Sequence, residues 1–196
     1  MTDVPLADRV RIRSVAVLSD HWGLVKTTTF DYRRSDGSWQ TQTRETYDRG
    51  DGATILLYNL SRRTVVLTRQ FRFPAFDKGH RELLIEAPAG KLEGAHPEDR
   101  IRAEAEEESG FRVSAPVKVF EAYMSPGSVT EKLHFYIAAY DETNRVSGGG
   151  GLAHEGEDIE TLEVTIEEAM AMLADGRIID GKTIMLLQHA RLTVFG

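Results

Sequence analysis

The sequence of 196 residues contains no cysteine. This absence excludes disulfides, thiolate zinc sites and cysteine nucleophiles together. The six histidines show no spacing typical of metal ligands; they are His21, His80, His96, His134, His154 and His189. A metal site would therefore depend on carboxylate and backbone oxygens, which favour Mg²⁺, Mn²⁺ or Ca²⁺.

The sequence also lacks long apolar runs and an excess of basic residues. No stretch reaches the roughly 18 apolar residues of a membrane helix, and the first 14 residues contain no apolar signal core. The 24 basic residues are outnumbered by 31 acidic ones, for a net charge of −7. Such a surface does not suit a long phosphate backbone. We therefore expect a cytoplasmic protein with no membrane segment and no nucleic-acid partner, in which any bound phosphate is small.

Apolar alternation and turn residues predict a β-rich N-terminal arm over residues 1–49. Its expected strands cover residues 9–18, 24–33 and 39–47, with Ser35-Asp36-Gly37 as a hairpin turn. The rest of the chain, residues 50–196, interleaves strands with helices. We expect strands at 53–58, 64–69, 83–86, 117–123, 133–140 and 160–164, and helices at 97–109, 166–174 and 183–191. Several connections are hairpins, so the pattern predicts an α/β protein whose sheet is mixed and flanked by helices.

The helix expected at 97–109 carries the densest chemical feature, Glu-Ala-Glu-Glu-Glu at residues 104–108. Glu104, Glu107 and Glu108 share one helical face, where like charges repel unless a cation lies among them. The alternative interpretation is a solvated acidic face, and the charge run alone favours neither. The preceding loop, Ala89-Gly90-Lys91, favours a metal site, because a backbone carbonyl there could complete an oxygen shell.

Residues 90–111 resemble the Nudix box, whose pattern is G-x5-E-x7-R-E-U-x-E-E-x-G-U with U a bulky apolar residue. The segment E-x-x-E-E-x-G-Φ at 104–111 is intact. His96 stands where the first Glu is expected, Ala103 where the Arg is expected, and the intervening segment has six residues rather than seven. Losing both members of an ion pair is less damaging than losing one. Arg102 lies about 100° round the helix from position 103, so Arg100, one turn before Glu104, is the better replacement.

The resemblance covers nearly the whole chain, through residues 44–54, 69–72, 123–127, 129–131, 156–159 and 180–183. These segments resemble the sugar-nucleotide group of Nudix hydrolases, which includes GDP-mannose pyrophosphatase and ADP-ribose pyrophosphatase. Of these two enzymes, the resemblance to GDP-mannose pyrophosphatase is the closer. The resemblance implies a Nudix α/β/α sandwich, Mg²⁺ (or Mn²⁺) as cofactor, and hydrolysis of GDP-mannose to GMP and mannose 1-phosphate. It also implies a homodimer with exchanged N-terminal arms, in which Arg44, Glu45 and Arg72 complete the partner's pocket.

The resemblance further implies a role for individual residues. The implied metal ligands are Ala89 through its carbonyl, Glu104, Glu108 and Glu157. The implied substrate contacts are Trp22, Arg44, Glu45, Arg72, Gly90, Lys91, Glu131 and Lys182. The implied catalytic residues are Glu157, Glu108 and Glu107, with Glu157 helping to position or deprotonate water. Glu155 and Asp158 are equally available acids in that loop, and a solvated turn is the alternative.

One further motif is set aside. Residues 176–183 match the P-loop pattern G-x-x-x-x-G-K-[ST], but they follow an expected helix instead of a strand. Three functions remain open: hydrolysis of GDP-mannose, the same chemistry on ADP-ribose or another ADP-sugar, and a Nudix-like binding module that has lost catalysis.

Overall fold

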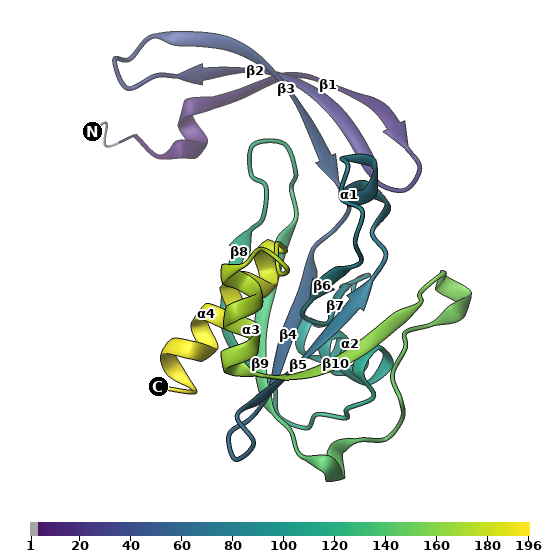
Figure 1. The fold of residues 1–196 in the computed structure, drawn as a ribbon. Coiled ribbons are helices and arrows are strands. Elements are labelled where there is room, and N and C mark those ends of the chain that lie inside the picture. The colour runs from purple at the N-terminus through teal and green to yellow at the C-terminus, as the bar shows by residue number, and fades with distance from the viewer. Residues whose placement is uncertain (1–3) are drawn as a thin grey trace. The chain divides into compact units, whose positions relative to one another are not determined.

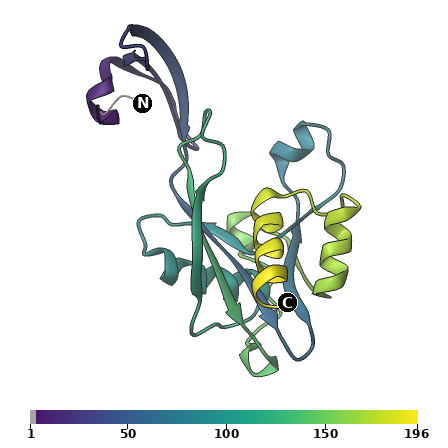
Figure 2. The same cartoon turned by 90° about the vertical axis from the view of Figure 1, so that its left-hand side faces the viewer.

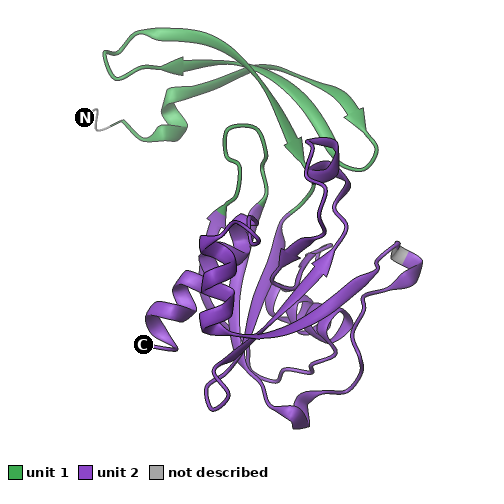
Figure 3. Cartoon of the chain, in the orientation of Figure 1, with its two compact units in different colours: residues 1–50, 123–131 green, residues 51–122, 132–196 purple. Residues whose placement is uncertain are grey.

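The computed structural model describes residues 4–196, apart from the side chain of residue 155. The chain divides into two compact units (Figure 3). Unit 1 comprises Met1–Gly50 and Tyr123–Glu131, and unit 2 comprises Asp51–Ala122 and Lys132–Gly196. Unit 1 thus includes a segment, Tyr123–Glu131, that the sequence places in the C-terminal domain. In the described part of the chain, no helix is both long and apolar enough to cross a membrane.

Unit 1 is a three-stranded antiparallel sheet in the order β1-β2-β3 (Figure 1). Its strands are β1 (Val10–Asp20), β2 (Leu24–Arg33) and β3 (Trp39–Asp48), preceded by the short 3₁₀ helix η1 (Leu6–Arg9). The β2–β3 turn contains Gly37 at φ 87°, a conformation that glycine adopts without steric cost. The Tyr123–Glu131 segment joins this unit at Tyr47, whose N–H donates to the Ser128 carbonyl at 2.8 Å. The three predicted strands are therefore confirmed.

The sheet of unit 1 has almost no core. Asp31 is the one buried residue in these three strands, and it accepts a hydrogen bond from Thr41 at 2.8 Å. Large apolar side chains are exposed instead; Ile12 and Val17 of β1 are 61% and 60% exposed. This sheet buries too little apolar surface to account for its own stability.

Unit 2 contains a seven-stranded mixed sheet. Five strands form its main path in the order β10-β5-β4-β9-β8, β6 pairs with β5, and β7 pairs with β4. Their bounds are β4 (Gly52–Asn59), β5 (Thr64–Gln70), β6 (Leu84–Glu86), β7 (Ala89–Lys91), β8 (Val117–Tyr123), β9 (Lys132–Ala139) and β10 (Ile159–Thr165). β4 pairs with β9 in parallel but with β5 and β7 in antiparallel fashion. The expected mixed sheet is confirmed.

Helices cover both faces of this sheet (Figures 1 and 2). α2 (Pro97–Ser109) packs on β4, β5, β7 and β10, while α3 (Ile166–Ala174) and α4 (Gly181–Thr193) pack on the other face and on each other. This is the expected α/β/α sandwich. The core under α2 includes Ile55, Leu57, Ile101 and Phe111, all without exposed surface.

The ends of α2 follow from the sequence. Pro97 occupies the first turn, where its missing N–H costs nothing, and Glu98 and Asp99 complement the helix dipole there. At the other end Gly110 adopts φ 79°, and its N–H donates to the Glu106 carbonyl at 2.9 Å. The sequence does not predict α1 (Phe73–Asp77) or β7, because elements of five and three residues are too short for a periodic signal.

Candidate active site

Helix α2 turns two of its glutamates into the protein. Glu104 and Glu108 are only 4% and 1% exposed. Glu107 is more exposed, and Glu106 turns outward to form two hydrogen bonds with Arg112 at 2.8 Å. The interpretation of this charge run as a solvated acidic face is therefore wrong for Glu104 and Glu108. It is correct for Glu106. Burying two carboxylates one turn apart is costly and calls for a positively charged neighbour.

Gly90 allows the loop before α2 to approach Glu104. β7 pairs with β4, with Gly90 opposite Ala53, and this holds the loop against the helix. A Cβ atom built on Gly90 would lie 1.6 Å from Glu104 Oε1. Only glycine leaves room for this carboxylate, so Glu104 and the loop backbone form one surface.

Glu108 contacts the same loop. Its Oε2 accepts a hydrogen bond from the Ala89 N–H at 3.1 Å. Burial raises the pKa of the Glu108 carboxyl to about 8, and the charges of Glu104 and Glu157 add to this effect. The Ala89 hydrogen bond and the charge of Arg72 oppose the shift. A divalent cation beside Glu108 would favour its ionised form, so metal binding at this carboxylate would be coupled to proton release.

Arg100 occupies the space between the loop and the acidic face of α2. Its guanidinium lies 2.5 Å from Glu104 Oε1 and 3.9 Å from Glu107, and its Nε donates to the Lys91 carbonyl at 3.1 Å. Arg102 instead pairs with Glu98 and Asp99 at the surface. The contacts therefore confirm that Arg100, and not Arg102, reaches the buried carboxylate; its role as the replacement for the arginine missing at position 103 stays a prediction.

These carboxylates do not form a ready-made metal cage. Among the described residues, no three His, Asp or Glu side chains lie close enough together to hold a metal ion. Glu104 is held by Arg100, and Glu157 accepts a hydrogen bond from the Leu152 N–H at 2.8 Å. The donor set nevertheless fits a hard cation, since buried carboxylate oxygens and a backbone loop are the ligands that Mg²⁺ prefers. Of the two other loop acids, Asp158 is exposed and the side chain of Glu155 lies outside the described residues.

A second cluster of charges lies at the end of β5 and β6. Arg72 Nε donates to Glu86 Oε2 at 2.8 Å, and Lys182 Nζ donates to Glu86 Oε1 at 2.6 Å. Lys182 also lies 3.1 Å from Asp180, which caps helix α4 by accepting a hydrogen bond from the Thr183 N–H. Burial lowers the pKa of Arg72, but the charge and hydrogen bond of Glu86 and the charges of Glu108 and Asp180 outweigh it, and the net shift is upward.

The structure brings Arg72 and Lys182 of the same chain together on Glu86 and places the charge of Arg72 close enough to act on Glu108 of that chain, whereas the sequence analysis assigned Arg72 to the partner's pocket. It also shows two residues that the sequence analysis missed, Glu86 and Asp180. A buried carboxylate that ends an apolar strand, as Glu86 does, is the signal that could have identified the first. The P-loop pattern at 176–183 is confirmed as incidental, because it connects α3 to α4.

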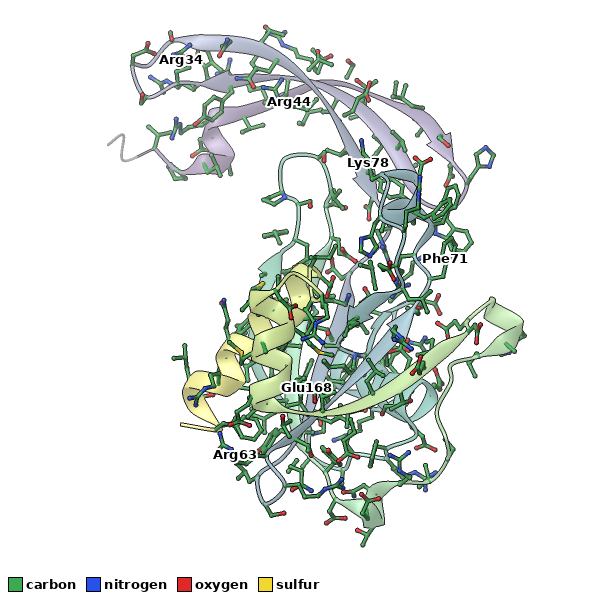
Figure 4. The ribbon with its side chains drawn as sticks, in the orientation of Figure 1. Arg34, Arg44, Arg63, Phe71, Lys78 and Glu168 are labelled. Atoms are coloured by element: carbon green, nitrogen blue, oxygen red, sulfur yellow. The ribbon has the colours of Figure 1, made fainter. Side chains whose placement is uncertain are left out.

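The remaining expected substrate residues belong to unit 1. Trp22, in the β1–β2 turn, is 83% exposed. Arg44 lies on β3 (Figure 4), where it pairs with Thr28 while Glu45 pairs with Thr27, so the two point to opposite faces of the sheet. Glu131 lies 3.6 Å from Arg49. The roles of these residues stay predictions.

Comparison with known proteins agrees with this architecture. Residues 9–47 match the family model described as "GDP-mannose pyrophosphatase NudK N-terminal domain", and residues 48–187 match the NUDIX domain model. A GDP-mannose pyrophosphatase of Pectobacterium atrosepticum is 57% identical over 175 residues, which are 89% of this chain and 90% of that protein. Proteins of the same name from Klebsiella pneumoniae and Citrobacter koseri are 48% and 46% identical, over 88% and 94% of this chain and 87% and 96% of their own. With the NUDIX model covering most of its length and relatives of this identity, the chain belongs to the Nudix family.

Proposed function

We propose that the protein hydrolyses the diphosphate bond of GDP-mannose to give GMP and mannose 1-phosphate. The relatives named GDP-mannose pyrophosphatase match nearly the whole chain. The observation that carries the proposal is the burial of Glu104 and Glu108 beneath the loop of Ala89 and Gly90. Burying two carboxylates side by side against a backbone loop costs free energy, and such a pair suits a cation that faces an anionic substrate.

Nudix proteins use a divalent metal ion, and we propose Mg²⁺ here, with Mn²⁺ as the alternative. Glu104, Glu108, Glu157 and the Ala89 carbonyl would hold it. When bound, the ion supplies neutralisation of the charge on the bridging phosphates. Arg100 already supplies part of this positive charge to Glu104, which keeps the carboxylate oriented.

The residues around this centre would divide the other tasks. Arg72 and Lys182 would bind phosphate oxygens, Gly90 and Lys91 would contact the substrate through the loop, and Glu107 would assist at the rim of the site. Glu157 would act as the general base, after leaving its hydrogen bond with the Leu152 N–H.

The sheet of unit 1 supports a homodimer with exchanged arms. Val15 pairs with Thr28, and Thr28 pairs with Arg44, so these residues share one face of the sheet. Ile12 and Val17 lie on this face as well, and all three apolar side chains are more than half exposed. A second copy of this chain would cover them, and Arg44 would then reach the partner's site from the same face. Glu45 and Trp22 remain substrate contacts of the proposal, and a cytoplasmic location remains a prediction.

A substrate panel tests the proposed reaction. The protein is incubated with Mg²⁺ and GDP-mannose, ADP-ribose and other nucleotide sugars, and nucleoside monophosphate release is measured. Glu108→Gln is the control, because it keeps the shape of the side chain and removes its charge. We expect release of GMP from GDP-mannose by the native protein alone. If most nucleoside monophosphate came from ADP-ribose, ADP-ribose and not GDP-mannose would be the substrate. If no nucleotide sugar were hydrolysed, the protein would be a Nudix-like binding module and not a hydrolase.

A further inference from the structure

Glu86 connects two cations that come from different parts of the chain. Arg72 follows β5, Lys182 lies in the first turn of α4, and Glu86 ends β6. Each cation binds a different oxygen of the same carboxylate, at 2.8 Å for Arg72 and 2.6 Å for Lys182. The side chain of Glu86 is only 5% exposed, so this carboxylate faces the two cations and not solvent.

Hydrogen bonds of Asp180 and Thr183 fix the start of α4, which carries Lys182, relative to Glu86. Asp180 accepts hydrogen bonds from the N–H and hydroxyl of Thr183 at 3.0 and 2.6 Å, which fixes the start of α4. The Thr183 hydroxyl in turn accepts from the Ala87 N–H at 2.7 Å, so α4 is tied to the residue that follows Glu86. The position of Lys182 relative to Glu86 is therefore set by backbone as well as by charge.

Arg72 keeps donors available. The side chain is 40% exposed, and its hydrogen bond to Glu86 uses Nε. Its two terminal nitrogens make no hydrogen bond to any residue that the structure describes. A planar guanidinium with two unused N–H edges beside an ammonium group matches the oxygens of a phosphate group.

Without Glu86 the like charges of Arg72 and Lys182 would repel each other. Because Asp180 contacts Lys182 directly, it is Arg72, on its long flexible chain, that would move away. We propose that Glu86 is a positioning residue that holds Arg72 and Lys182 side by side as a clamp for one phosphate group of the substrate. The inference rests on the proposed function for the identity of that substrate. Glu86 does not touch the substrate; it acts through the two cations.

Glu86→Gln tests the clamp while keeping the size of the side chain. The amide accepts from one cation and presents its NH₂ group to the other, so the pair separates. We expect KM for GDP-mannose to rise roughly ten- to hundredfold, as for lost hydrogen bonds to charged groups, with a much smaller change in kcat. Glu86→Asp, which keeps the charge, should recover part of the loss. An unchanged KM in Glu86→Gln would overturn the proposal.

A double-mutant cycle separates positioning from a general structural role. Because Glu86 acts through Lys182 as well as through Arg72, the variant with both Glu86→Gln and Lys182→Met should lose less kcat/KM than the product of the two single losses. Additive losses would overturn the proposal. The matched control is Glu160→Gln, which removes the partner of Arg69 in an ion pair at the surface. It should leave KM unchanged, and melting temperatures of all variants establish that they fold.

Binding of inorganic pyrophosphate tests the phosphate clamp independently of the proposed hydrolysis of GDP-mannose. Calorimetry with inorganic pyrophosphate should show affinity reduced roughly tenfold or more in Glu86→Gln compared with the native protein. This result would support the clamp even if the native protein hydrolysed no nucleotide sugar, which would refute the proposed function alone. Equal affinities would refute the clamp alone.

Discussion

The carboxylate of Glu104 occupies the space in which any side chain at position 90 would lie, with Oε1 1.6 Å from the position of a Cβ on Gly90. A methyl group there must displace a glutamate that Arg100 holds from the other side. The relationship makes one glycine a direct test of the site.

Gly90→Ala should therefore damage the site more than the fold. Displacing the carboxylate by about 1 Å is expected to lower kcat/KM roughly 100-fold. Steady-state kinetics and a Mg²⁺ titration measure the effect. Gly148→Ala is the matched control, because a Cβ at Gly148 meets no atom within 4 Å. Native metal affinity and activity in Gly90→Ala would contradict the placement of Glu104 at the metal site.

Arg100→Ala should weaken Mg²⁺ binding by roughly 10- to 100-fold, as expected when a residue that orients a ligand is removed. The double variant Arg100→Ala with Ala103→Arg returns an arginine to the position of the family motif and should regain part of this affinity. Arg102→Ala serves as control, since its partners Glu98 and Asp99 lie at the surface. Calorimetry measures all three. A loss in Arg102→Ala as large as that in Arg100→Ala would count against the assignment.

The raised pKa of Glu108, about 8 compared with 4.5 for a free glutamate, predicts how metal-free stability depends on pH. Between these values the unfolded chain has lost this proton while the folded chain retains it, so the free energy of unfolding decreases as pH rises. Below pH 4.5 both states are protonated, and above pH 8 both are ionised, so the contribution is constant outside this window.

Thermal melting from pH 5 to pH 9 measures this effect. Added Mg²⁺ binds the ionised form, so the increase in Tm caused by Mg²⁺ should grow as pH rises towards 8. Glu108→Gln should remove most of this dependence. If Mg²⁺ raised Tm equally at pH 5 and pH 8, the result would contradict the raised pKa of the buried Glu108 carboxyl.

Val15→Lys should dissociate the proposed dimer and abolish activity with it. Val15 lies on the face of the unit 1 sheet that carries Ile12 and Val17, and a buried charge there has no partner. Ser14→Lys is the control one residue away: Ser14 pairs with Thr29 on the opposite face and is exposed. Analytical ultracentrifugation distinguishes the two. A Val15→Lys protein that sediments as the native one does would exclude this face as the dimer contact.

The sequence predicts α2 to the residue, because proline and glycine mark its two ends. It also predicts that Arg100 reaches Glu104, since residues four apart share a helical face. Burial of the acidic face could not be predicted from the charge run, because the same pattern is typical of a solvated helix. Glu86 was missed for a different reason. Its partners are 14 and 96 residues away, and no local pattern connects them.

The strand order of unit 2 has a consequence for synthesis. β5 pairs on one side with β10, with Ile159 opposite Gln70, and β4 pairs in parallel with β9. Both partner strands follow α2 in the sequence, so these pairings can form only after α2 has been synthesised. Pairings between such distant segments form late, because a long loop must close before they can contribute. On the ribosome, α2 therefore emerges before β9 and β10, the strands that complete the sheet beneath it.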